Sequence, residues 1–193
     1  ADPSGLEFWA DELTRGTPRS EVAYQMVQLA YPEEFQRDTV KSLYEQYLGR
    51  AADPTGMQFW TAYLYDGGTI EGMSAALVAS REYYQLRGQG TDAGFLGALF
   101  HDALGRAIGS ADLTYFEGLM ANGMSAADVA AIIFNSDEYH RLRVDALFEQ
   151  FLDRPADAGA IGYFAGELDG GATDELVISQ LISSEEYYDR AQV

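Results

Sequence analysis

The feature that most constrains this chain is an internal repeat. A pair of adjacent aromatic residues recurs four times, as Phe8-Trp9, Phe59-Trp60, Tyr115-Phe116 and Tyr163-Phe164. The second aromatics of successive pairs are separated by 51, 56 and 48 residues. Recurrence at such a period is typical of repeat proteins, in which neighbouring units bury each other's apolar faces. The fold should therefore consist of copies of one unit.

The residues that flank each aromatic pair recur as well. An arginine lies ten residues before the second aromatic in the last three copies, at Arg50, Arg106 and Arg154. A glycine lies seven residues after it in all four copies, at Gly16, Gly67, Gly123 and Gly171. The last three copies close with Ser-x-Glu-Tyr, whose glutamates are Glu82, Glu138 and Glu186. The repeated unit is thus much longer than the aromatic pair.

Many of the repeated residues are those that begin and end helices. Asp53 before a proline is typical of an N-cap, and Gly67 is placed to end that helix in a left-handed conformation. Thr69 predicts the next N-cap, and Ser125 with Asp128 has the spacing of a capping box. No useful length of chain alternates apolar and polar residues as a strand would. The sequence predicts an all-α fold, a tandem array of about three-helix repeats packed into one elongated or compact helical domain.

The repeats predict how the chain is divided. The expected segments are 1–35 (partial first repeat), 36–87 (second repeat), 88–94 (Gly-rich loop), 95–143 (third repeat) and 144–193 (fourth repeat plus the start of the next connecting helix). Pro32 should begin one connecting helix, and an unbroken pattern from Ser136 to Leu152 predicts another. Because the first and last copies are incomplete, we expect the chain to be a piece of a longer repeat region.

Composition narrows the classes of function. Twelve Lys and Arg against 31 Asp and Glu give a formal charge of −19, which repels phosphate backbones, so we expect no nucleic-acid partner. No stretch approaches the roughly 18–20 apolar residues of a membrane helix, so we expect no membrane insertion. The chain has no Cys and two His, and we expect His101 and His140 to be surface or structural residues. We therefore predict that it is not an enzyme.

The complete motif resembles the repeat of a bacterial family. Leu-Gly-Arg-x-x-Asp-Pro-x-Gly-x-x-x-Trp, then Leu-x-x-Gly, Thr or Ser, and Ser-x-Glu-Tyr, is similar to the domain-of-unknown-function 4214 family, and more distantly to helical linker domains of phycobilisomes. The residues that carry the resemblance best are Leu48, Gly49, Arg50, Asp53, Pro54, Gly56, Trp60, Gly67, Ser80, Glu82 and Tyr83. The third copy departs from the motif with Gly109 in place of the aspartate. The fourth copy keeps Asp157 but has alanine for the proline and the second glycine.

This resemblance implies a cellular setting. Such repeats are found in large secreted or surface proteins, beside calcium-binding repeats, adhesins, S-layer segments or polysaccharide-modifying enzymes. It therefore implies an extracellular or cell-surface location, with partners among other domains of the same secreted protein, surface proteins or polysaccharide. It implies no catalytic activity.

The repeated arginines and glutamates are interpreted as structural. Arg50, Arg106 and Arg154 each follow a predicted helix end, where a cation can bond the last carbonyl groups and interact favourably with the helix dipole. Pairing of these arginines with a glutamate of the Ser-x-Glu-Tyr motif is a second interpretation, and anion binding is a third. The glutamates concerned are Glu82, Glu138 and Glu186.

Four aspartates are candidate calcium ligands. Asp53, Asp66, Asp157 and Asp169 lie in short loops beside exposed carbonyl groups, and calcium prefers such oxygen ligands. The twelve-residue EF-hand loop and the nonapeptide calcium repeat are both absent from the sequence. Capping of the following helix is the simpler role for Asp53, so calcium stays one alternative and no other cofactor is expected.

The aromatic residues leave two interpretations open. Adjacent helical residues point about 100° apart, so one member of each pair should be core while the other packs between repeats or stacks on sugar rings. The candidates for glycan stacking are Trp9, Trp60, Tyr65 and Tyr84. The favoured function is a noncatalytic structural or adhesive module of an exported bacterial protein. The alternative is a carbohydrate-binding module, assisted by calcium, that anchors a secreted enzyme or adhesin to polysaccharide.

Overall fold

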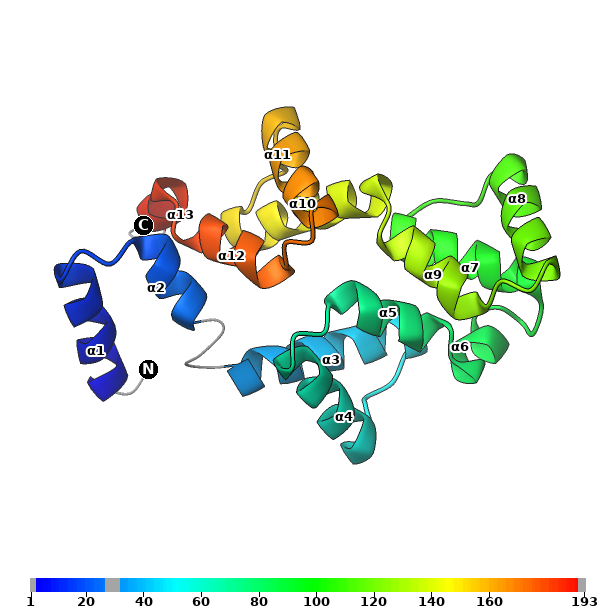
Figure 1. Ribbon diagram of the computed structural model, residues 1–193, viewed down its shortest axis with the longest axis horizontal. Helices are drawn as coiled ribbons and strands as arrows, with labels where there is room; N and C mark the ends of the chain where they lie inside the picture. Colours follow the sequence, from blue (N-terminus) through cyan, green and yellow to red (C-terminus); the bar gives the residue numbers. More distant parts are fainter. Residues whose placement is uncertain (1–2, 27–31, 191–193) are drawn as a thin grey trace. The chain divides into compact units, whose positions relative to one another are not determined.

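The computed structural model describes residues 3–26 and 32–190, and in these residues it contains helices and no strand (Figure 1). The prediction of an all-α fold with repeated helical packing is confirmed. The helices are α1 (Pro3–Thr14), α2 (Arg19–Gln25), α3 (Pro32–Leu48), α4 (Pro54–Tyr65), α5 (Ile70–Val78), α6 (Arg81–Leu86), α7 (Asp92–Leu104), α8 (Ser110–Ala121), α9 (Ala126–Phe134), α10 (Asp137–Leu152), α11 (Ala158–Asp169), α12 (Asp174–Ile182) and α13 (Glu185–Arg190). No helix in the described part of the chain is long and apolar enough to cross a membrane.

Side-chain caps begin the helices where the sequence predicts them. The Asp53 carboxylate accepts hydrogen bonds from the Thr55 and Gly56 amides at 3.0 and 2.9 Å. Thr69 caps α5. Ser125 and Asp128 form the predicted capping box at the start of α9. These bonds satisfy amide groups that have no partner within the helix.

Glycines end the helices that carry the aromatic pairs. Gly67 has the predicted left-handed conformation, with φ of +92°, and the glycines at the same repeat position have φ between +92° and +97°. Such a conformation is unfavourable for residues with a Cβ atom. The Gly-rich segment interrupts the helices between Leu86, where α6 ends, and Asp92, where α7 begins, so residues 92–94 of the expected loop lie in α7. Both predicted connecting helices are present, as α3 and α10.

The contacts divide the chain into two compact units. The first unit contains residues 1–35 and 143–193, and the second contains residues 36–142. In the second unit α5 packs on α9, and in the first unit α2 packs on α12. The sequence pattern predicts one helical domain, whereas the packing pairs the second copy with the third and the first copy with the fourth. The predicted repeat boundaries are not tested by this division.

Each unit has its own apolar core. The core of the second unit includes Tyr47, Tyr83, Phe95, Phe100 and Phe134, whose side chains are almost completely buried. The core of the first unit is smaller and consists mainly of aliphatic residues. Its fully buried members are Val144, Leu147 and Val177. The helices that carry the aromatic pairs, α4, α8 and α11, contribute the second aromatic of each pair to these cores, together with aliphatic residues such as Leu64, Ala165 and Leu168.

Candidate functional site

A bidentate ion pair occurs three times in the structure. In each, Nε and Nη2 of the arginine donate hydrogen bonds to the two carboxylate oxygens of a glutamate 32 residues later, at distances between 2.5 and 2.8 Å. The pairs are Arg50–Glu82, Arg106–Glu138 and Arg154–Glu186. This parallel geometry is the strongest that an arginine and a carboxylate can form.

Each paired arginine makes two further contacts. Its guanidinium lies over an aromatic ring six residues earlier, with centroid distances of 5.0 to 5.3 Å. Its Nη1 donates to the carbonyl of the next residue. That carbonyl lies in the loop after the helix, so the arginines do not cap the last helical carbonyls as the first interpretation expected. All three guanidinium nitrogens thus donate a hydrogen bond. We call the ion pair, the ring contact and this bond together the arginine clamp.

The clamps alter the acidity of their glutamates. Hydrogen bonds from the paired arginines lower the pKa of Glu82, Glu138 and Glu186 below the ordinary value of 4.5, and burial opposes this effect only in part. The carboxylates are therefore charged at neutral pH, as the bidentate geometry requires. We assign them a structural role.

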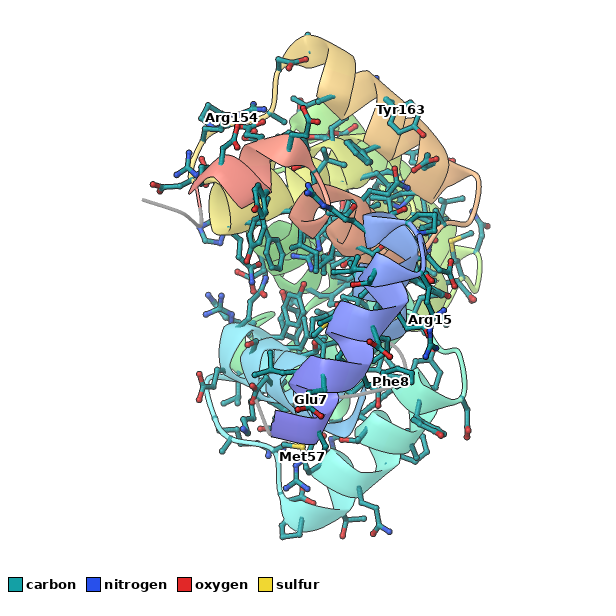
Figure 2. The ribbon with its side chains drawn as sticks, turned by 90° about the vertical axis from the view of Figure 1, so that its left-hand side faces the viewer. Glu7, Phe8, Arg15, Met57, Arg154 and Tyr163 are labelled. Atoms are coloured by element: carbon teal, nitrogen blue, oxygen red, sulfur yellow. The ribbon has the colours of Figure 1, made fainter. Side chains whose placement is uncertain are left out.

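The two members of each aromatic pair face different surroundings. The second aromatic is buried or partly buried, as at Phe116, of which 7% is exposed. The first aromatic is 55% to 61% exposed in every copy, and these residues are Phe8, Phe59, Tyr115 and Tyr163. Figure 2 labels two of them, Phe8 on α1 and Tyr163 on α11. A large apolar side chain is thus exposed at the same repeat position four times.

Of the four residues predicted to stack on glycans, Trp9 lies in the first unit and the other three in the second. Trp60 packs against the core of the second unit, while Tyr65 on the same helix is 64% exposed. The Tyr84 hydroxyl donates to Asp92 at 2.8 Å, and this bond raises the Tyr84 pKa. Trp9 is partly buried and meets Phe8 edge to face at 4.8 Å. Each of the four therefore lies in a different environment.

A pocket in the second unit combines an exposed aromatic with polar groups. It has a volume of about 490 Å³, a size usual for small-molecule sites. It lies along the last two turns of α4 and the turn that follows, and its lining residues are Gln58, Phe59, Ala62, Tyr63, Asp66, Gly67 and Gly68. We call it the α4 pocket. Asp66 is one of the predicted calcium ligands, and Phe59 is the exposed member of an aromatic pair for which sugar stacking was one interpretation.

Close packing fixes one wall of the α4 pocket. The Tyr63 ring lies against the backbone of Gly68, where an added Cβ would overlap the ring, and the Tyr63 hydroxyl lies against Gly72 in the same way. The third copy has Met124 and Asp128 at the two glycine positions, and the fourth has Ala172 and Leu176. The sign of this site in the sequence is glycine at both positions of the second copy, where the third and fourth copies have larger residues.

The four candidate calcium ligands are distributed over two helices. Asp53 caps the start of α4 and Asp66 follows its end, while Asp157 caps the start of α11 and Asp169 is its last residue. Each helix has 12 residues, so its ends are about 18 Å apart at 1.5 Å per residue. Among the described residues, no group of three or more His, Asp or Glu side chains could hold a metal ion. Within each unit the two candidate aspartates therefore lie at opposite ends of one helix, and calcium binding stays a prediction.

A buried carboxylate was not anticipated from the sequence. Asp102, whose side chain is 5% exposed, accepts hydrogen bonds from Arg87 and from the Tyr83 hydroxyl at 2.9 Å. Burial would raise the Asp102 pKa, but the hydrogen bonds from Arg87, His101 and Tyr83 outweigh it and lower the pKa. His101 is itself exposed, whereas His140 is buried. This cluster ties α6 to α7 across the Gly-rich loop.

Comparison with known proteins places the chain in a family. A family model described as a domain of unknown function (DUF4214) matches residues 30–86 and 73–143, which together span more than half of the sequence. The chain belongs to the DUF4214 family. No curated protein and no solved structure matches it.

The family match can be related to the clamps. The first DUF4214 match contains Arg50 and Glu82, and the second contains Arg106 and Glu138. The third clamp, Arg154–Glu186, lies outside both matches and has the same geometry. The fourth copy therefore shares a DUF4214 structural feature that the family match does not reach.

Proposed function

We propose that this DUF4214 chain is a noncatalytic structural and adhesive repeat module of an exported or cell-surface bacterial protein. The observation that carries the proposal is the recurrence of an exposed first aromatic in all four copies, at Phe8, Phe59, Tyr115 and Tyr163. Single exposed apolar residues are common on protein surfaces. An aromatic that is exposed in every copy of a repeat suggests a surface that binds a partner.

The structural part of the proposal is supported by the clamps. Each one joins the end of a connecting helix to the Ser-x-Glu-Tyr helix of the same copy, across 32 residues. The clamp thereby holds together the two ends of a segment that contains two helices, the first of which carries the aromatic pair. A repeat built in this way presents its first aromatic at a fixed place.

A noncatalytic role is supported by what the ionisable groups do. The most strongly perturbed of them, Tyr83, is buried, and burial followed by the Asp102 charge raises its pKa. Its hydroxyl is used in the cluster that joins α6 and α7. The glutamates with lowered pKa values are held by arginines, and Asp53 and Asp157 by amide groups at helix starts. These shifts are explained by folding contacts.

The proposed location and partners rest on the family resemblance and on charge. A net charge of −19 suits a setting in which divalent cations screen acidic surfaces. The proposed partners are other domains of a larger secreted protein, surface proteins or polysaccharide. The same charge argues against nucleic acid as a partner.

Carbohydrate binding is the second candidate, and the α4 pocket favours it. Phe59 offers an exposed ring face and Tyr63 a ring held in place by two glycines, which suits the apolar face of a sugar. Gln58 and Asp66 place an amide and a carboxylate beside them, for hydrogen bonds to hydroxyl groups. Asp66 also offers one hard oxygen ligand to a bridging calcium ion.

A glycan array tests both candidates. The whole chain is applied in calcium-containing buffer and again after chelation, together with Phe59→Ala and, as a matched control, Tyr115→Ala. Binding to a defined polysaccharide that Phe59→Ala abolishes and Tyr115→Ala keeps would support the α4 pocket as a glycan site. Loss of binding on chelation would support the calcium bridge. Absence of binding in every arm would reject the carbohydrate alternative and leave protein partners for the adhesive module.

A further inference from the structure

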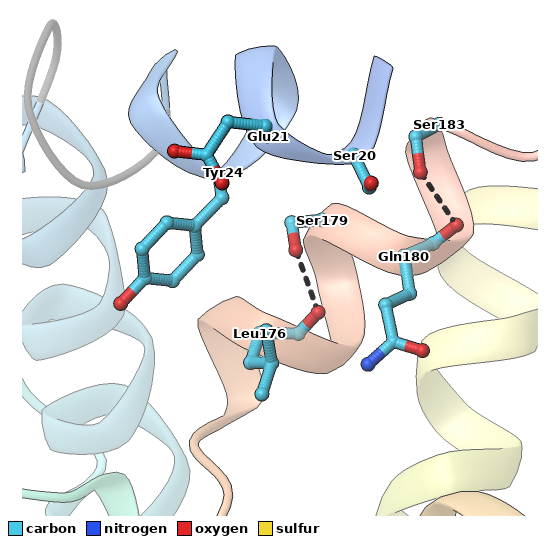
Figure 3. A pocket seen from close by; sticks show the side chains of 7 residues that line it. All are labelled: Ser20, Glu21, Tyr24, Leu176, Ser179, Gln180 and Ser183. Carbon is cyan, nitrogen blue, oxygen red and sulfur yellow. Dashed lines mark hydrogen bonds between the residues drawn. The ribbon is translucent and has the colours of Figure 1, made fainter. Parts of the chain in front are cut away.

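A second pocket lies in the first unit, between α2 and α12 (Figure 3). It has a volume of about 570 Å³ and is broadly open to solvent. Three residues of α2, three of α12 and the residue that follows α12 line it, and they are Ser20, Glu21, Tyr24, Leu176, Ser179, Gln180 and Ser183. We call it the α2–α12 pocket. Six of these seven side chains carry a polar group.

The α12 wall of this pocket is rich in hydrogen-bond acceptors. Ser179 and Ser183 donate their hydroxyl protons to the backbone carbonyls three residues earlier, at 2.7 and 3.0 Å. Ser179 is almost completely buried, whereas Ser183 is partly exposed and its oxygen can accept a hydrogen bond from a ligand. Gln180 donates from its amide nitrogen to Glu167 at 2.9 Å, which leaves its carbonyl oxygen available. A ligand that meets this wall should therefore donate hydrogen bonds.

The α2 wall adds donors and a carboxylate. One oxygen of Glu21 accepts a hydrogen bond from Gln25 at 2.7 Å. Within residues 3–26 and 32–190, the hydroxyls of Ser20 and Tyr24 have no hydrogen-bond partner. No lysine or arginine lines the pocket. The Tyr24 ring and the Leu176 side chain supply its apolar surface.

The equivalent helix pair in the second unit shows that this polarity is not a property of the repeat. When the helices are aligned on their N-cap residues, Pro18 and Thr69, Glu21 corresponds to Gly72 and Val22 to Met73. Val22 and Met73 are both buried, so the alignment also matches the core faces of the two helices. The first unit thus has an exposed carboxylate beside the pocket at a position where the second unit has glycine.

From these groups we infer that the α2–α12 pocket binds a sugar unit that carries no negative charge. A sugar ring presents hydroxyl groups that donate and accept, together with an apolar C–H face, and the pocket offers a matching partner for each. An acidic sugar would meet the Glu21 carboxylate with no cation to compensate it, and juxtaposed like charges oppose binding. The pocket thereby distinguishes sugars by charge.

This site is independent of the proposed adhesive function and of the α4 pocket. The two pockets lie in different units and share no residue. Failure of the α4 pocket to bind glycans would leave this inference standing, and the reverse holds as well. Substitutions in one pocket can therefore serve as controls for the other.

Titration of the whole chain followed by amide NMR shifts tests the inference. The probes are glucose, galactose, mannose and N-acetylglucosamine as neutral sugars, and glucuronate and galacturonate as acidic ones. We expect at least one neutral sugar to shift the signals of Ser20, Ser179 and Gln180 saturably, and its uronate counterpart to bind about tenfold more weakly. Absence of shifts at these residues with every neutral sugar at 50 mM, or equal binding of acidic and neutral sugars, would overturn the inference.

Two variants with matched controls sharpen the test. Glu21→Gln should keep neutral-sugar binding and raise the affinity for the uronate about threefold or more, because the opposing charge is removed. Ser20→Leu, which adds bulk to the α2 wall of the pocket, should weaken neutral-sugar binding about tenfold. The controls are Glu117→Gln and Ser110→Leu, at exposed positions on α8, and both should bind as the unaltered chain does. Circular dichroism verifies that each variant is folded, and a folded Ser20→Leu chain with unchanged affinity would refute the site.

Discussion

At the residue scale, the arginine of each clamp makes three kinds of contact at once. It pairs with a glutamate, lies over a ring and donates to a loop carbonyl, so its shape matters as much as its charge. A lysine in its place would keep the charge but could not form the two parallel hydrogen bonds. The clamps are half-exposed, which limits the contribution of each to stability.

We expect Arg106→Lys to lower the free energy of unfolding by about 1 kcal/mol, because the fork and the stacking on Phe100 are lost while the charge remains. Urea unfolding of Arg106→Lys, Glu138→Gln and the double variant measures this as a double-mutant cycle. Coupling near zero between the two positions would show that the pair contributes nothing. Arg141→Lys, whose ion pair with Asp137 lies within one helix, is the control.

The clamps also predict an acid dependence. The pKa of Glu82, Glu138 and Glu186 is lowered in the folded chain, mainly by hydrogen bonds from the arginines. Their contribution to stability is therefore complete above the unfolded value near 4.5 and is lost as the pH falls through the lower folded pKa. The stability difference between the unaltered chain and the triple Glu→Gln variant should shrink between pH 5 and pH 3 in urea unfolding. A difference that stays constant over this interval would contradict the assignment.

The sequence contains the signal for the clamp in the spacing of its residues. Arginine and glutamate are 32 residues apart in all three copies, although the copies differ in total length. The length differences fall outside the clamp, as at the Gly-rich loop. Pairing was one of three interpretations from sequence, because nothing in a single chain's residue types distinguishes a cap from a long-range ion pair.

At the scale of the element, α4 differs from its counterparts through what its Tyr63 contacts. The ring lies on Gly68 and its hydroxyl on Gly72, so the turn after α4 and the start of α5 are packed against one side chain. This packing forms the wall of the α4 pocket. The equivalent glutamate on α11, Glu167, instead accepts hydrogen bonds from Tyr163 and Gln180.

Gly68→Ala should destabilise the chain by about 1–3 kcal/mol, because the new methyl group overlaps a ring that cannot move without disturbing Gly72. Gly118→Ala is the matched control, since an added Cβ there meets nothing within 4 Å, and it should stabilise α8 by about 0.5–1 kcal/mol. Thermal and urea unfolding compare the two. In a Tyr63→Ala background the cost of Gly68→Ala should largely disappear, and an unchanged cost would show that the ring is not its cause.

Helix boundaries were largely predictable, whereas the pocket was not. The caps at Asp53, Thr69 and Ser125 are local hydrogen bonds between residues two or three apart, so the sequence pattern contains them. The contact of Tyr63 with two glycines is a tertiary contact with no periodic pattern. Residue types also do not show which member of an aromatic pair faces the core. Trp60 was therefore named as a stacking candidate, although it packs against the core and its neighbour Phe59 is exposed.

At the scale of the whole molecule, the copies associate in pairs within two units. From the sequence, each copy is expected to pack on the next one along the chain. In the structure α5 of the second copy packs on α9 of the third, while α2 of the first copy packs on α12 of the fourth. Helices of similar pattern compete for the same partners, and the choice depends on complementary shapes that residue types alone do not reveal. The division into units was therefore beyond prediction from the repeat.

Separate cores predict separate responses to a cavity. Leu147→Ala removes a fully buried side chain from the core of the first unit and should cost about 2–5 kcal/mol there. Amide hydrogen exchange should then accelerate in α2 and α12 more than in α5 and α9. Leu99→Ala, in the core of the second unit, should give the opposite pattern. Equal acceleration everywhere in both variants would show that the units unfold as one.

The account depends most on the claim that the first aromatic of each pair is free for a partner and the second maintains the fold. Tyr115 and Phe116 are adjacent on α8, with 61% and 7% of their surfaces exposed, so one pair of alanine variants tests it directly. In urea unfolding, Phe116→Ala should lower the free energy of unfolding by about 3–5 kcal/mol. Tyr115→Ala should lower it by no more than about 1 kcal/mol, which is the contribution of the edge-to-face contact with Phe116. Equal losses for the two variants would contradict the account, because the exposed aromatic would then be part of the fold.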